Sequence, residues 1–229
     1  MISAGPHRTR PGPALACVST GIGALPARVP RGRGARPIAA GLEALRPLCA
    51  TRVALGAIVL VGLALRLGTV GFGHDWLTFQ PDEDANIPIA LRLSWGHLNP
   101  HVFYYPDLTW YLLFTVNWLV YWFGKQLGLV ADWAQFRSLF ESQPVPFFLL
   151  GRTLSVAVGT ATIGLVYALG RRLYSPAHGL VAAAFLAVAF LHVRDSALAT
   201  PDATMTGLVV LSLLGAAGVL RYGRPRDYA

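Results

Sequence analysis

The chain has 229 residues, of which 13% are charged, whereas a soluble domain carries about 25%. Its mean hydropathy is +0.50. This composition excludes an ordinary soluble domain, and it is too apolar for a disordered protein. The net charge of +8 does not indicate nucleic-acid binding, because eight arginines and one acid fall within residues 1–53, directly before the first apolar segment.

The N-terminal segment, residues 1–50, is rich in Pro, Gly and Arg and shows no apolar period. We therefore expect a disordered basic arm. Because Arg and Lys accumulate on the cytoplasmic side of membrane proteins, this arm predicts a cytoplasmic N-terminus. Both cysteines, Cys17 and Cys49, lie in the arm, and they provide neither a disulfide framework nor a metal-ligand spacing.

Four apolar segments follow, and a helix needs about twenty residues to cross a bilayer. They cover residues 53–72, 147–170, 178–193 and 203–220. In the first, we expect Arg66 to reach the outer interface by snorkelling. In the second, the small residues Ser155, Gly159 and Gly164 would let another helix approach closely. The sequence thus predicts an all-α polytopic membrane protein, with residues 51–229 as its transmembrane part.

A fifth apolar segment, residues 108–123, nearly has the length to cross. Basic residues decide against a crossing, since Arg171 and Arg172 follow the second span and three arginines follow the last. With four spans, all of these lie on the same side as the basic arm, as the positive-inside bias requires. The aromatic segment is therefore predicted to lie in the outer leaflet. The loop 73–146 and the turn 194–202 then share the outer face.

The strongest candidates for chemistry are Asp82 and Glu83, which stand with Asp84 after Pro81. Neighbouring carboxylates repel one another, which perturbs at least one pKa, and a carboxylate can accept a proton from a hydroxyl nucleophile. Proline followed by acids is equally an ordinary helix start. Residues 82–95 have the pattern of a short amphipathic helix.

Further candidates lie at the ends of the later spans. Asp202 opens the fourth span after Thr200 and Pro201, again a standard helix start, and it could face the acids near Asp82. Arg194 is adjacent to Asp195 at the end of the third span, and neighbours on a helix do not face each other directly. Arg152, inside the second span, either holds a phosphate with its guanidinium fork or snorkels to the surface.

The segment 99–107 places aromatic residues between prolines. His101 and Tyr105 in it suit a sugar or lipid-headgroup platform, and they suit an interfacial turn equally well. No glycine-rich phosphate loop, catalytic triad or zinc spacing occurs in the sequence.

Together these motifs resemble membrane glycosyltransferases of the GT-C fold. The resemblance is to the dolichyl-phosphate-mannose–protein mannosyltransferase family and its bacterial relatives, including the aminoarabinose lipid A transferases and the Rgt-type transferases. It rests on the following stretches in this order: Leu65-Arg66-Leu67, Pro81-Asp82-Glu83, Tyr105-Pro106, Gly151-Arg152-Thr153-Leu154-Ser155, Gly159-Thr160-Ala161-Thr162, Gly170-Arg171-Arg172-Leu173, His192-Val193-Arg194-Asp195-Ser196 and Ala199-Thr200-Pro201-Asp202. The family commonly has Pro-Pro where this chain has Pro106-Asp107.

The resemblance implies that Asp82 and Glu83 are the catalytic signature and that Asp202 is a second acidic position of the site. It implies inverting transfer of a sugar from a polyprenyl-phosphate donor to a hydroxyl acceptor on a protein, lipid or glycan. No cofactor is assigned, and a divalent metal bridging the donor phosphate and the acids is left open.

The expected location is the bacterial inner membrane, with chemistry on the outer face. Family members have more spans than these four, so the resemblance implies that a C-terminal part is missing. An inactive fragment or part of a transporter are the alternatives. Transporters place ionisable residues near the bilayer midplane, whereas these acids gather at the outer rim, which favours the enzyme.

Overall fold

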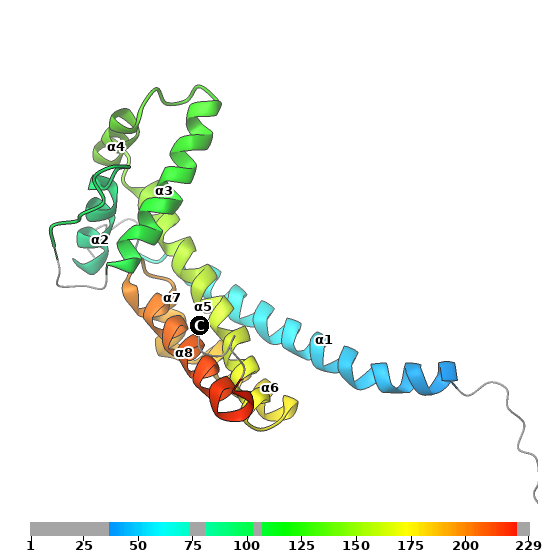
Figure 1. Cartoon of the computed structure of the whole chain (residues 1–229). Helices are drawn as coiled ribbons and strands as arrows, with labels where there is room; N and C mark the ends of the chain where they lie inside the picture. The colour runs from blue at the N-terminus through cyan, green and yellow to red at the C-terminus, as the bar shows by residue number, and fades with distance from the viewer. Residues whose placement is uncertain (1–36, 74–80, 103–106, 224–229) are drawn as a thin grey trace, which may run out of the picture.

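The computed structural model describes residues 37–73, 81–102 and 107–223 (Figure 1). Over these ranges the protein has eight helices and no strand, as predicted. In chain order the helices are α1 (Pro37–Thr69), α2 (Pro81–Arg92), α3 (Leu108–Gln126), α4 (Trp133–Ser142), α5 (Val145–Leu173), α6 (Pro176–Val188), α7 (Phe190–Ser196) and α8 (Pro201–Tyr222).

Three helices of the described chain are long and apolar enough to cross a membrane, over Cys49–Thr69, Val145–Leu173 and Pro201–Arg221. Helices α6 and α7 add a fourth if the pair forms one span, with a bend of 62° between them. The third predicted span is therefore broken at Ala189, which lies outside helical geometry. The helices fit a multi-pass membrane protein.

The first helix begins earlier than the predicted span. Residues 37–50, expected as part of the arm, continue α1 as helix, and the rest of the predicted arm lies outside the described residues. The helix ends at Thr69, slightly before the predicted boundary at residue 72.

The end of the bundle that contains the C-terminus of α5 is fixed by arginines and close backbone contact. Arg172 Nη1 donates to the carbonyl of Leu214 at 3.0 Å, and Arg221 donates to the carbonyl of Arg172. A Cβ on Gly170 would lie 2.8 Å from Cα of Gly179, so α5 and α6 meet backbone to backbone. Arg172 and Arg221 therefore share one end, as the predicted topology requires, while Arg224 and Arg226 lie outside the described residues.

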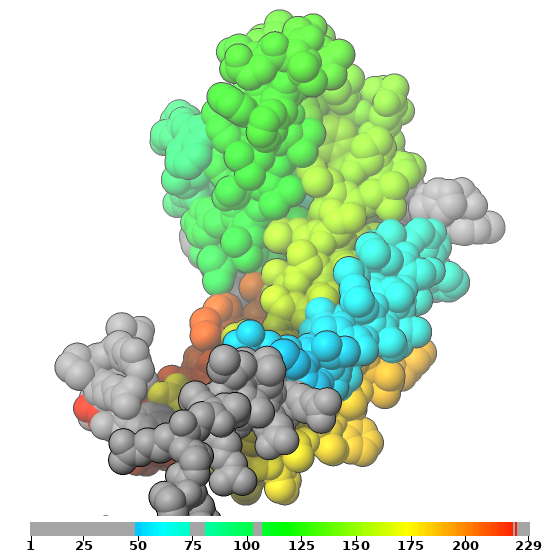
Figure 2. Space-filling model, turned by 90° about the vertical axis from the view of Figure 1, so that its right-hand side faces the viewer, coloured from blue at the N-terminus to red at the C-terminus, as the bar shows by residue number. Residues whose placement is uncertain are grey.

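At the other end of α5, helices α2, α3 and α4 form a separate helical block (Figure 1). Figure 2 shows α3 standing at this end, while α1 lies across α5 farther along. Helix α3 does not qualify as a span among the described residues, consistent with the prediction that 108–123 does not cross.

The aromatic side chains of α3 were expected at the lipid headgroups, but several pack inside this block. Trp110 is fully buried. The ring centroids of Trp118 and of Trp133 on α4 are 5.2 Å apart. Those of Tyr121 and Phe136 are 5.9 Å apart. These aromatic contacts hold α3 against α4. Trp122 remains exposed.

Arg66 does not snorkel, contrary to expectation. Its side chain is fully buried, and it donates to the carbonyls of Gly62 at 2.7 Å and Ala187 at 3.3 Å. Its Nη2 also lies 2.7 Å from Nδ1 of His192. Since Ala187 lies beside the break between α6 and α7, Arg66 satisfies a carbonyl that the interrupted helix leaves unpaired.

Three small residues of α5 were predicted to allow close helix packing, and two of them lie at such contacts. Ser155 is buried, and a Cβ on Gly159 would lie 2.2 Å from Oγ of Ser196. Gly164 was wrongly included, because nothing lies within 4 Å of a Cβ built there. A further close approach occurs at Gly151, where a Cβ would lie 2.8 Å from that of Ala199.

Candidate functional site

The candidate site begins at the first turn of α2, which starts at Pro81 as the sequence predicts and carries Asp82, Glu83 and Asp84. Successive residues of a helix point about 100° apart. The three carboxylates therefore occupy different environments. Asp82 is exposed, Asp84 is half-buried, and Glu83 is 1% exposed.

Glu83 forms a buried two-point ion pair with Arg152 of α5. Arg152 Nε donates to Oε1 at 2.9 Å, and Nη2 donates to Oε2 at 2.6 Å. The Glu83 side chain is 1% exposed, and the Arg152 side chain is 5% exposed. Arg152 Nη1 also donates to the carbonyls of Val70 at 3.0 Å and Phe72 at 2.8 Å. The pair thus ties α2, α5 and the chain after α1 together.

Glu83 also anchors the turn between α7 and α8. Its Oε1 accepts a hydrogen bond from the backbone N–H of Ala199 at 2.6 Å. The predicted meeting of the long loop with the turn 194–202 is therefore observed. With both oxygens engaged, Glu83 positions α2 against α5 and the turn. Its catalytic role beside Asp82 stays a prediction.

A neighbouring polar link was missed in the sequence. Asn86 is fully buried. Its Oδ1 accepts from Trp110 Nε1 at 2.8 Å, and its Nδ2 donates to the carbonyl of Ala199 at 3.4 Å. Asn86 thereby joins α2 to α3 and to the same turn.

Helical periodicity could have identified both anchors. Five buried residues of α2 recur at the spacing of one helix face. They are Glu83, Asn86, Ile87, Ala90 and Leu91. Two polar residues on an otherwise apolar stripe must find partners inside the protein. The amphipathic pattern of residues 82–95 was predicted, but Glu83 was considered as a catalytic candidate with Asp82 and not as part of the buried face.

The two remaining acids differ in their surroundings. Burial raises the pKa of Asp84 above its ordinary value, and the nearby charge of Glu83 raises it further. Asp82 is the exposed carboxylate at the start of this helix.

Asp202 lies at the first turn of α8, after Thr200 and Pro201, as predicted. It lines a cavity of about 230 Å³ together with His192, Asp195 and Thr206. This cavity lies between α7 and α8 and includes no described residue of α2. The expectation that Asp202 faces the acids near Asp82 stays a prediction.

Arg194 and Asp195 do meet, although adjacent residues on a helix were expected not to. Arg194 Nε and Nη2 lie 2.8 and 2.7 Å from Oδ1 of Asp195. The Arg194 side chain is 55% exposed. Because exposed ion pairs contribute little stability, this guanidinium is available to another anion.

The aromatic platform expected around His101 has little support in the described residues. His101 is exposed, with a positive φ of 55°. Its backbone N–H donates to Oδ1 of Asn99 at 2.8 Å, which is the hydrogen bond of a tight Asx turn. Tyr105 lies outside the described residues.

A divalent metal would need several oxygen ligands around one point. Over the described ranges, no group of three His, Cys, Asp or Glu side chains is arranged to hold a metal ion. Because Glu83 is engaged by Arg152, the acids of α2 do not supply a ready set of ligands. No step of the reaction proposed for this protein is assigned to a metal.

Comparison with known proteins gives one match. A family model described as dolichyl-phosphate-mannose-protein mannosyltransferase matches residues 138–229. No curated protein and no solved structure matches the chain. The matched part contains Arg152, Arg194 and Asp202, whereas Asp82 and Glu83 precede it. Over residues 138–229 the chain matches the model of the dolichyl-phosphate-mannose-protein mannosyltransferase family, and the predicted resemblance is confirmed for this part of the chain.

Proposed function

We propose that this protein is a membrane glycosyltransferase that moves a sugar from a polyprenyl-phosphate donor to a hydroxyl acceptor at the extracytoplasmic face. The family match supports glycosyl transfer in a membrane. The assignment of residues is supported by the different surroundings of two neighbouring acids in α2. Glu83 is buried against Arg152, and Asp82 is exposed at the same helix start.

In the proposed reaction Asp82 is the general base. Its carboxylate takes the proton of the acceptor hydroxyl while that oxygen attacks the anomeric carbon of the donor. The bond between this carbon and the phosphate oxygen breaks, and its electron pair leaves with polyprenyl phosphate. Attack opposite the leaving group inverts the anomeric centre.

Arg194 is the better candidate for stabilising the departing phosphate. Arg152 was predicted either to hold a phosphate or to snorkel, but its side chain makes four hydrogen bonds inside the protein. The Arg194 side chain is 55% exposed, and a guanidinium fork matches phosphate oxygens. The turn that follows α7 contacts Glu83 through the N–H of Ala199. A guanidinium beside the departing phosphate stabilises the negative charge that develops on it in the transition state, and this lowers the activation barrier.

The test is transfer by vesicles from cells that overproduce the full chain. Radiolabelled polyprenyl-phosphate mannose is added, and label on the vesicles' own acceptors is counted. We expect Asp82→Asn to lower transfer by about 10²-fold or more, because it removes the base. Asp84→Asn is the matched control in the same helix turn and should retain most activity. Near-normal transfer by Asp82→Asn, or no transfer by the unaltered chain, would refute the proposal.

A further inference from the structure

A basic groove is lined by residues of α2 and α4, two helices of the block at the N-terminal end of α5 (Figure 1). Its volume is about 360 Å³, within the range of small-molecule sites. Arg92, in the last turn of α2, and Arg137, in the middle of α4, both line it. Two cations from separate helices therefore converge on one space.

Neither cation is neutralised by an ion pair. Both arginines are exposed, and the two ion pairs between described side chains involve Arg152 and Arg194 instead. Glu141 also lines the groove, but it forms no ion pair with either arginine. The groove thus has a net positive charge and two guanidinium forks that are free to bind a ligand.

Apolar side chains also line the groove, together with the hydroxyl of Ser138. Pro88 and Leu91 line it from α2, and Ala134 and Phe140 line it from α4. Leu91 is buried in the core of the block, and Phe140 packs against that core. A ligand here meets two guanidinium groups and apolar side chains in one groove, which suits an amphiphile with an anionic head.

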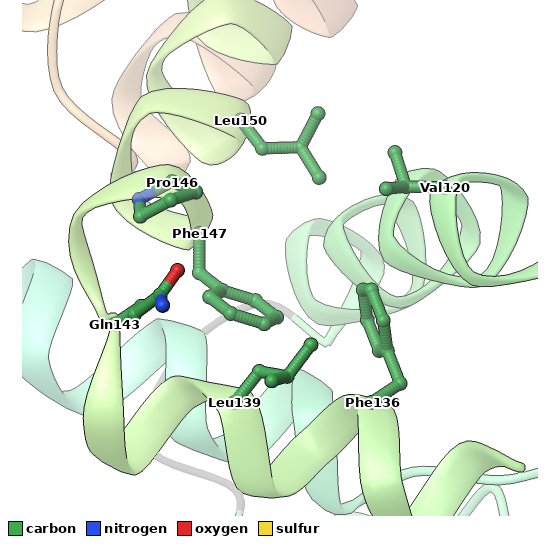
Figure 3. A pocket seen from close by; sticks show the side chains of 7 residues that line it. All are labelled: Val120, Phe136, Leu139, Gln143, Pro146, Phe147 and Leu150. Carbon is green, nitrogen blue, oxygen red and sulfur yellow. The ribbon is translucent and has the colours of Figure 1, made fainter. Parts of the chain in front are cut away.

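Helix α4 separates this groove from a second, apolar cavity of about 160 Å³. Figure 3 shows Phe136 and Leu139 of α4 and Phe147 of α5 around that cavity, with Val120 of α3 across it. The basic groove is therefore on the other side of α4. Arg92 is also ten residues from Asp82 on α2, about 15 Å along the helix axis.

We propose that the groove between α2 and α4 binds a phosphate ester, supplied by the headgroup of an anionic membrane lipid. Two arginine forks can share the oxygens of one phosphate. Glu141, which lines the same groove, repels the phosphate and so lowers the affinity. This proposal is independent of the transfer reaction, because it uses none of the residues assigned to it.

Native mass spectrometry of the full chain in detergent tests the proposal, with phosphatidylglycerol and phosphatidylcholine of matched acyl chains as probes. We expect phosphatidylglycerol to bind more tightly. The double variant Arg92→Gln, Arg137→Gln should weaken its binding at least tenfold and leave phosphatidylcholine unaffected. Lys125→Gln is the matched control, since Lys125 is an exposed base on α3 outside the groove. Glu141→Gln should tighten phosphatidylglycerol binding several-fold, a gain that misfolding cannot imitate.

Competition with inorganic phosphate identifies the source of the ligand. If millimolar phosphate displaces the lipid, the groove recognises the phosphate group alone; if it does not, the lipid headgroup with its chains is the ligand. Equal binding of phosphatidylglycerol by the unaltered chain and the double arginine variant would overturn the proposal. An equal loss in Lys125→Gln would also overturn it, because the effect would then be one of general charge.

Discussion

The buried pair of Glu83 and Arg152 offers the sharpest test of how this protein is held together. In Glu83→Gln, Arg152 stays buried at 5% exposure without a counter-charge. Removing one partner of such a pair costs about 3–5 kcal/mol. The glutamine still offers an oxygen to the N–H of Ala199, which Glu83 binds at 2.6 Å. The loss therefore reports mainly on the charge pair.

Arg152→Met removes the other partner and should cost a similar amount. In the double variant neither charge is left alone, so the total loss should be close to that of one single variant, with a coupling of about 3 kcal/mol. Arg194→Met is the matched control, because it breaks the exposed pair with Asp195 and should cost about 0–1 kcal/mol.

The assay is reversible unfolding in detergent micelles by added SDS, followed by tryptophan fluorescence. The free energy of unfolding is measured for the two single variants, the double variant and the control. If the free energy of unfolding fell by less than about 1 kcal/mol in both single variants, the pair would contribute no more than an exposed surface ion pair. Strictly additive losses would show that the two side chains act independently, and the anchoring role of Glu83 would be refuted.

Three further predictions test helix packing, pH dependence and topology. Gly159→Ala should lower the free energy of unfolding by about 1–3 kcal/mol, because its Cβ would lie 2.2 Å from Oγ of Ser196. The control Gly164→Ala, which meets nothing within 4 Å, should be neutral or stabilising, and an equal loss at both positions in the same SDS assay would contradict this. The raised pKa of Asp84 means that the folded state holds a proton more strongly than the unfolded state. Its contribution to stability is therefore full below the ordinary aspartate pKa and is lost as pH rises through the folded value. Thermal unfolding between pH 4 and 7 should show a fall with pH that Asp84→Asn removes; an unchanged pH profile in that variant would count against the assignment. Finally, a tag inserted at Pro176 should report from the same side of the membrane as the N-terminus, and a report from the opposite side would refute the four-span topology.

Much of the helical framework could be predicted from the sequence, because length and apolarity are local properties. A segment such as 147–170 is long and apolar enough to cross a bilayer whatever surrounds it, and α5 is found there. The distribution of basic residues also allowed a long-range prediction, because the arginines after the second and fourth spans indicated that these two span ends lie on the same side of the membrane. Arg172 and Arg221 meet at that end.

The role of each polar side chain could not be predicted in this way. In the sequence Arg66 looks like a snorkelling residue, and Arg152 looks like either a snorkelling residue or a phosphate ligand. Both are instead buried with several hydrogen bonds inside the protein. A guanidinium in the membrane is costly unless it finds acceptors. Those acceptors are the broken helix near Ala187 for the first and Glu83 for the second, which are 121 and 69 residues away.

The sequence by itself determined that this is an all-helical, multi-pass membrane protein with acids at the start of α2, and its motifs pointed to the family that matches residues 138–229. Only the tertiary structure decided that Glu83 is an anchor and Asp82 the exposed acid. The physical reason is that neighbouring residues on a helix face directions about 100° apart. Which of them is buried depends on where α5 and the turn at Ala199 pack against α2.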